Sequence, residues 1–227
     1  VHRGEALGFL GPNGAGKSTT INVLLDYVRP TTGTVQVLGY DTQTETQAIH
    51  KRIGVLPDGY SLYDRLTGNE HLELAAQLKQ TNVDVRAVCD RVGLDESDAD
   101  RPTGSYSKGM SQRLALGMAL VGNPDLLILD EPTTGLDPHG ISRMKSLIQT
   151  ELDRGTTVFF SSHVLDHVES ACDRVAILDD GMLVAVDTID GLREAVDSET
   201  LTLEELFAEY TNKTDHQPVT TREVSAE

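Results

Sequence analysis

The chain has 227 residues and a formal net charge of −17 at pH 7. This length accommodates one large domain, with or without an inserted subdomain. An acidic surface repels the phosphates of nucleic acids and anionic lipids, and the longest apolar run, residues 114–121, is too short to span a bilayer. We therefore expect a cytoplasmic chain that binds no nucleic acid and does not insert directly into lipid.

The composition also indicates the surroundings of the protein. Only 6 of the 19 basic residues are lysines, against 36 acidic residues. This balance favours adaptation to a high-salt cytosol, in which salt screens the repulsion between carboxylates, with ordinary solubility as the other interpretation. Cys89 and Cys172 lack metal-binding or redox spacing. We therefore expect both to behave as ordinary small apolar residues of a protein in a reducing compartment.

A glycine-rich turn follows the first expected strand, residues 6–10, and precedes a helix expected over residues 18–28. It reads G-x-x-x-x-G-K-S and comprises Gly11, Pro12, Asn13, Gly14, Ala15, Gly16, Lys17 and Ser18, followed by Thr19. In this context the backbone N–H groups and the helix N-terminus form a phosphate-binding loop. Lys17 can reach the β- and γ-phosphates, and the Ser18 hydroxyl can be a Mg²⁺ ligand. The sequence thus predicts a nucleoside triphosphate site, with a plain glycine-rich turn as the alternative.

The next segment alternates short elements and then becomes helical. We expect a strand over 34–38, a helix over 46–52 and a strand over 53–56 that ends at Pro57-Asp58-Gly59. The block over 62–122 contains helical patterns and no strand. Its expected parts are a helix over 67–80 opened by a capping box, a helix over 83–92, a polar loop over 95–103, and an apolar helix over 111–121. This block predicts a helical insert within an α/β domain.

Two carboxylates follow the apolar run 126–129, at Asp130 and Glu131. A continuous apolar run is typical of a central parallel strand, and α/β sheets bind ligands at the carboxyl ends of such strands. Adjacent strand residues point to opposite sides, so Asp130 can belong to a Mg²⁺ shell while Glu131 orients or deprotonates water. The alternative is a strand that ends in solvated acids.

The rest of the chain continues the α/β pattern. Asp137 and Pro138 begin a helix expected to reach residue 154. The other expected elements are a strand over 156–160 followed by Ser161-Ser162-His163, a helix to 171, a hairpin of 174–178 and 182–186, an amphipathic segment over 203–210, and a polar, disordered tail from 211.

Several motifs together resemble those of ATP-binding cassette (ABC) ATPases. The run 106–110, Tyr-Ser-Lys-Gly-Met, resembles the LSGGQ signature loop, and 130–138 resembles the Walker B motif with its D-loop. His163 matches the switch histidine of the family. The resemblance covers residues 4–192 and implies a P-loop NTPase (RecA-like) α/β fold, a parallel sheet flanked by helices with an all-helical insert. It implies one ABC domain over 1–192, with core 1–57 and 123–192 and helical subdomain 58–122, then a C-terminal helix and tail over 193–227.

The resemblance also implies an ATP-sandwich dimer with Mg²⁺. Two copies would close head to tail, so that Ser107 and Gly109 of one contact the γ-phosphate bound by the other. Glu131 and His163 would be catalytic, and Asp137 would couple the two halves. The other histidines, including His139 and His167, are expected at the surface.

Three departures from the family pattern matter. Asp58 stands where the family usually has the Q-loop glutamine. We expect Asp58 to contact Mg²⁺, either directly or through a water; the alternative is that it is a plain turn residue. Lys108 and Met110 give a signature typical of subunits that serve ABC-2-type exporters. The family's first strands, which carry an aromatic that stacks on adenine, are not found before residue 1, so we expect an N-terminally truncated cassette.

The resulting prediction is an ATPase subunit that binds ATP and Mg²⁺ and dimerises. It would power a separate transmembrane permease, an ABC-2-type exporter, from the cytoplasmic face of the membrane. The alternative is a soluble ABC ATPase without a permease, of the ribosome-associated or iron–sulfur assembly type.

Overall fold

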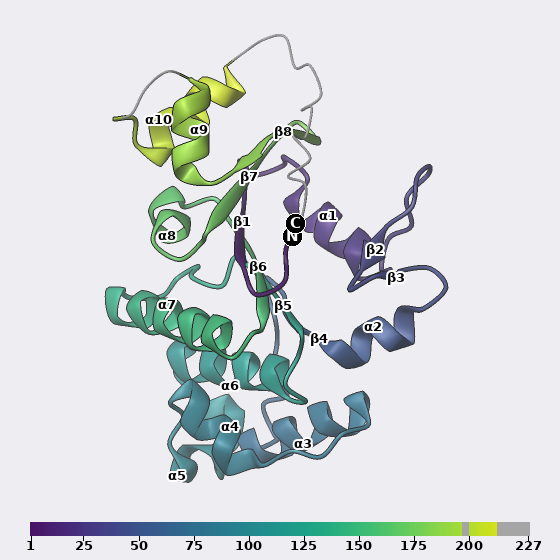
Figure 1. Ribbon diagram of the computed structural model, residues 1–227. Helices are drawn as coiled ribbons and strands as arrows, with labels where there is room; N and C mark the ends of the chain where they lie inside the picture. The colour runs from purple at the N-terminus through teal and green to yellow at the C-terminus, as the bar shows by residue number, and fades with distance from the viewer. Residues whose placement is uncertain (197–199, 213–227) are drawn as a thin grey trace.

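The structure, a computed structural model, describes residues 1–196 and 200–212, and its centre is a six-stranded sheet in the order β4-β5-β6-β1-β7-β8 (Figure 1). All neighbouring strands are parallel except β8, which runs antiparallel to β7. The strands are β1 Ala6–Leu10, β4 Ile53–Leu56, β5 Leu126–Asp130, β6 Thr157–Ser162, β7 Arg174–Asp179 and β8 Met182–Asp187. The hairpin predicted from the sequence is therefore the antiparallel edge of a parallel sheet.

Helices cover both faces of the sheet, because its central strands are apolar on both sides. Alternate residues of β1 supply the two cores: Leu7 and Phe9 pack on one side, and Ala6 and Leu10 on the other. The first side carries α1 and α2, and the second carries α7 and α8 (Figure 1). These helices are α1 Lys17–Leu24, α2 Thr46–Arg52, α7 Pro138–Asp153 and α8 Leu165–Glu169.

A helical insert lies beyond the β4 edge of the sheet (Figure 1). It consists of α3 Gly68–Lys79, α4 Val85–Val92, α5 Glu96–Ala99, a 3-10 turn over Thr103–Ser105 and α6 Lys108–Leu120. The predicted capping box is confirmed: Thr67 accepts from the Glu70 backbone, and the Glu70 side chain accepts from the Thr67 backbone. A buried ion pair of Arg91 in α4 and Glu151 in α7 joins the insert to the core.

Some predicted element boundaries were wrong, for local reasons. The helix expected over 18–28 ends at Leu24, because Asp26 adopts a left-handed φ of 58°. The strand expected over 34–38 is only β2 Gln36–Val37, since Leu38 and Gly39 both have positive φ and turn the chain into β3 Tyr40–Asp41.

Other corrections concern helices. The loop expected over 95–103 contains α5, and the helix expected from 111 begins three residues earlier at Lys108, with Ser107 as its N-cap. The helix expected after His163 and up to residue 171 is only α8, Leu165–Glu169.

The C-terminal part contains two helices where the sequence predicted one. An unpredicted helix, α9 Ile189–Ala195, precedes α10 Leu203–Thr211. The tail expected from 211 is helical at Thr211 and from 213 onward lies outside the described residues. None of the helices in the described ranges is long and apolar enough to cross a membrane.

Candidate active site

The phosphate loop is fixed between β1, α1 and the turn of the β7–β8 hairpin. Gly14 and Gly16 have φ values of 88° and 107°, which glycine adopts far more readily than other residues. A Cβ on Gly11 would lie 2.6 Å from the Leu178 carbonyl oxygen, so no larger residue fits there. The Gly181 N–H donates to the Ala15 carbonyl at 2.9 Å, so the hairpin turn supports the loop directly.

Lys17 is the first residue of α1, and its side chain is folded back onto the loop. It is only 7% exposed. Its Nζ donates to the Gly11 carbonyl at 2.8 Å and lies 3.4 Å from Oε1 of Glu131. Asn13, Gly14, Ser18 and Thr19 are exposed beside it, so the mouth of the loop is open. The Lys17 ammonium group is therefore held by oxygens of the protein itself.

The carboxyl ends of β5 and β6 bring the two predicted carboxylates to this loop. Asp130 pairs with Ser161 in the sheet, and the Ser161 hydroxyl donates to its carboxylate. The Glu131 N–H donates to the carbonyl and the hydroxyl of Ser161, at 3.2 and 3.1 Å. Oε2 of Glu131 lies 2.8 Å from Nδ1 of His163. Lys17, Glu131 and His163, distant in the sequence, thus form one connected cluster.

The oxygen donors at this edge are suited to Mg²⁺. No group of three or more His, Cys, Asp or Glu within 1–196 and 200–212 is placed to hold a metal ion. Mg²⁺ in phosphate sites needs only one or two carboxylates, because waters and phosphates complete its shell. Asp130 and the exposed Ser18 hydroxyl supply such hard oxygens, so they fit the predicted ion. Asp58 is exposed just beyond the end of β4, next to β5.

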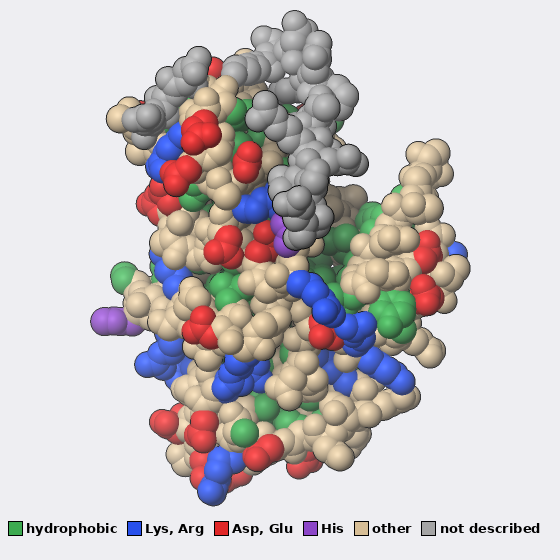
Figure 2. Space-filling view, viewed as in Figure 1, with side chains coloured by type: hydrophobic (Ala, Val, Ile, Leu, Met, Phe, Trp, Pro, Cys, Tyr) green, Lys and Arg blue, Asp and Glu red, His purple; other side chains and the backbone are tan. Residues whose placement is uncertain are grey.

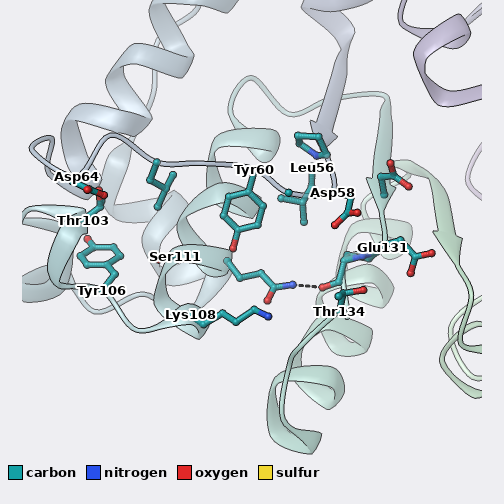
Figure 3. Close-up of a pocket in the computed structure, with 16 residues that line it drawn as sticks. Leu56, Asp58, Tyr60, Asp64, Thr103, Tyr106, Lys108, Ser111, Glu131 and Thr134 are labelled. Carbon is teal, nitrogen blue, oxygen red and sulfur yellow. Dashed lines mark hydrogen bonds between the residues drawn. The ribbon is translucent and has the colours of Figure 1, made fainter. Parts of the chain in front are cut away.

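A cleft of about 390 Å³ runs from these carboxylates toward the helical insert (Figure 3). Asp58 and Glu131 line its sheet end, and Tyr60, Tyr106 and Lys108 line its helical end. Burial raises the pKa of Tyr60 to about 12, so this phenol stays neutral. The cleft therefore joins the candidate catalytic edge to the insert.

Ser107, Gly109 and Asp137 lie at a second hollow, of about 440 Å³. Ser107 caps α6 by accepting from the Met110 N–H at 3.3 Å, and Asp137 caps α7 by accepting from the Gly140 N–H at 2.8 Å. In the described part of the chain, no hydrogen bond or ion pair joins these residues to the phosphate loop or to Glu131. Within one copy of the chain, Ser107 and Gly109 thus line a different hollow from the one that Glu131 lines.

Two residues of the site were missed from the sequence. Gln112 in α6 is 5% exposed and donates from Nε2 to the Pro132 carbonyl. Nδ1 of His167 lies 2.9 Å from the Thr133 hydroxyl. His139 is exposed as expected, but the surface expectation was wrong for His71, which is 1% exposed. His167 is half-buried, and burial, aided by the charge of Lys145, lowers its pKa. Gln112 stands between Ser111 and Arg113, so no local pattern in the sequence distinguished it.

Comparison with known proteins identifies the class. The family description "ABC transporter" matches residues 1–134, which is more than half of the chain. The chain therefore belongs to the ABC transporter family and contains its ATP-binding domain.

Among curated relatives, the daunorubicin/doxorubicin resistance ATP-binding protein of Streptomyces peucetius is 38% identical over 89% of this chain and 63% of its own length. The bacitracin transport ATP-binding protein of Bacillus licheniformis is 39% identical over 86% of this chain and 64% of its own length. An uncharacterised ABC transporter ATP-binding protein of a Nostoc strain is 43% identical over 85% of this chain and 58% of its own. The chain thus spans about three fifths of the length of these relatives.

Solved structures confirm the predicted fold class. An ATP-binding subunit of an ABC transporter superposes with a TM-score of 0.83 at 30% identity, covering 92% of this chain and 88% of that one. A dimeric cassette in a post-hydrolysis state, bound to ADP and Pi, superposes with a TM-score of 0.75 at 25% identity, covering 83% and 87%. The fold is that of the ABC ATPases, a P-loop NTPase with a mainly parallel sheet flanked by helices.

Proposed function

We propose that this chain hydrolyses ATP, dimerises around it, and powers a separate membrane permease of the ABC-2 exporter type. The observation that carries the hydrolytic part is the cluster of Lys17, Glu131 and His163, joined by contacts of 2.8 to 3.4 Å, in a member of the ABC transporter family. The exporter part is supported by Lys108 and Met110 in the signature loop and by the resistance and transport names of the relatives.

The chemistry follows from the positions of these groups. Lys17 would exchange the Gly11 carbonyl for the β- and γ-phosphates, with the N–H groups of the loop and the start of α1 around them. Glu131 would orient or deprotonate the attacking water, while His163 holds the carboxylate and contacts the γ-phosphate. Ser18 and Asp130, with Asp58 through a water, would hold Mg²⁺, which when bound neutralises phosphate charge.

A Glu131→Gln variant tests this assignment. Loss of the base should lower kcat by about 10²- to 10⁴-fold, while ATP affinity is retained because the phosphate loop is untouched. The variant should then accumulate as an ATP-bound dimer, measured by size-exclusion chromatography with ATP. Glu73→Gln, on the exposed side of α3, is the matched control. A Glu131→Gln protein that stays active and monomeric would refute the proposal.

Dimerisation is supported by the separation of Ser107 and Gly109 from the cluster. Both line an open hollow at the start of α6, where N–H groups can receive a phosphate from outside the chain. Asp137 lies at the same hollow, as expected of a residue that couples two copies. A second copy of the chain would thus complete each ATP site.

The cleft between the sheet edge and the insert is the proposed contact with the permease. Tyr60, Leu62 and Tyr106 give it an apolar wall, Asp58 links it to the nucleotide edge, and Tyr63 nearby is 66% exposed. Co-purification from detergent with a multi-span protein encoded beside this chain would test the contact. Tyr63→Glu should weaken association and leave the ATPase rate of the isolated chain unchanged; failure to bind any membrane protein would favour a soluble cassette.

A further inference from the structure

The backbone that carries Glu131 is held in an unfavourable conformation. Glu131 has a φ of 50°, a left-handed value that is uncommon for a residue with a side chain. Such conformations persist only where the surroundings over-determine them, and they concentrate at functional sites. The Thr134 N–H closes a turn by donating to the Glu131 carbonyl at 3.1 Å. The direction of the carboxylate therefore depends on what holds the Glu131–Thr134 turn.

Two side chains from different helices hold this turn. Gln112, from the helical insert, donates to the Pro132 carbonyl (Figure 3, dashed line). His167, from the core helix α8, is bonded to the hydroxyl of Thr133, which is itself only 5% exposed. Hydrogen bonds in such a buried place are costly to leave unmade, so each anchor restrains the residue that it contacts.

We propose that Gln112 and His167 are positioning residues that anchor the turn from two sides and so set where the Glu131 carboxylate points. The inference rests on the proposed hydrolytic role of Glu131. Neither residue touches that carboxylate: Gln112 acts through Pro132, and His167 through Thr133. When an anchor is lost, the turn relaxes toward an ordinary φ, and the carboxylate moves away from His163, now at 2.8 Å.

The His167 anchor is tested from both of its ends. Thr133→Val and His167→Leu each remove the hydrogen bond and keep most of the volume, so each should lower kcat about three- to tenfold, the worth of one hydrogen bond. The double variant should be no worse than either single variant, because both remove the same bond. His167→Gln, which keeps a hydrogen-bonding side chain, should restore most of the rate. Thr150→Val, on the exposed face of α7, is the matched control.

The Gln112 anchor is tested by Gln112→Met, which keeps the shape and removes the donor. Its effect on kcat should multiply with that of Thr133→Val, because the two changes release different anchors. ATP affinity, measured by calorimetry, should stay within about twofold in all variants, since none of these side chains contacts the phosphate loop. The crystal structure of Gln112→Met/Thr133→Val should show a separation of Glu131 Oε2 and His163 Nδ1 longer than 2.8 Å.

Three results would overturn the inference: an unchanged kcat with only a lower melting temperature, a joint loss of kcat and ATP affinity, or an unmoved Glu131 in the double-variant crystal. Glu131→Gln is assayed in parallel. If Glu131→Gln keeps the wild-type rate, the hydrolytic assignment fails. The crystal structure still decides whether the two anchors position the carboxylate.

Discussion

Two regions are held in different ways: the carboxyl end of the sheet, where Lys17 of α1 meets Glu131 (the sheet edge), and the start of α6 with Ser107 and Gly109 (the helix start). At the sheet edge, contacts join residues far apart in the chain, such as Lys17 with Glu131 and Glu131 with His163. At the helix start, the contact of Ser107 is local, with Met110 three residues away, and the surface faces a hollow. The first region is preformed within one copy, whereas the second is an open surface, which we propose a second copy covers.

The ion pair that joins the helical insert to the core gives the largest expected effect. Arg91 and Glu151 are 9% and 0% exposed in their side chains, and Arg91 also donates to Asn123 at 2.9 Å. Glu151→Leu leaves a buried guanidinium without its carboxylate and should lower the free energy of unfolding by about 3–5 kcal/mol, measured by urea titration. Glu96→Gln removes the exposed partner of Arg86 and should cost less than about 1 kcal/mol. If both variants lost the same free energy of unfolding, the Arg91–Glu151 pair would not be what joins the insert to the core.

Lys17→Ala should damage the sheet edge alone. Loss of a charge-assisted contact to phosphate should weaken ATP binding on the order of 100-fold, measured by calorimetry. The exposed Lys51→Ala on α2 is the control and should bind ATP normally. Normal ATP affinity in the Lys17 variant would show that the preformed cluster is not the phosphate site.

Gly109→Ala should affect only the helix start. The nearest atom to an added Cβ is Nη2 of Arg113 at 3.8 Å, so the monomer has room for it. Alanine favours the helix, so stability should rise by about 0.5–1 kcal/mol while ATP affinity of the monomer is unchanged. In the Glu131→Gln background the ATP-bound dimer should weaken, because the methyl group obstructs an approaching phosphate. Undiminished dimerisation in size-exclusion chromatography would contradict the role of this surface; Ser111→Ala in the same helix is the control.

The smallest effect concerns charge over the whole molecule. Figure 2 shows acidic side chains near the top and the bottom of the face in view, with basic ones gathered across its middle. If the net charge of −17 reflects a salty cytosol, thermal stability should rise from about 0.1 to about 3 M KCl as repulsion is screened. An unchanged melting temperature over this range of KCl would contradict the hypothesis of adaptation to a high-salt cytosol.

The sequence predicted elements that carry their own local signals. The helix Thr46–Arg52 and the strand Ile53–Leu56 match residue for residue, and the Thr67 capping box opens α3 as expected. Short helices such as α5 and α9 were missed, because four to seven residues provide too little periodicity.

The residues of the candidate site that belong to a sequence motif were predicted, and those that reach the site only through packing were missed. The phosphate loop, Asp130, Glu131 and His163 have recognisable neighbours in the sequence. The bond from Gln112 to Pro132 joins residues 20 apart, and that between Thr133 and His167 joins residues 34 apart. Contacts of that kind arise only when helices pack on the sheet, so no local pattern indicates them.

The folded-back Lys17 has a consequence for the order of events. Its ammonium group lies between the Gly11 carbonyl and the Glu131 carboxylate. Under the proposed function, an arriving triphosphate would compete with these internal oxygens for the lysine. Once the lysine had moved to phosphate, the Glu131 carboxylate would lose its counter-charge and could act on the attacking water. The proposed base would thus be masked until the substrate itself unmasks it.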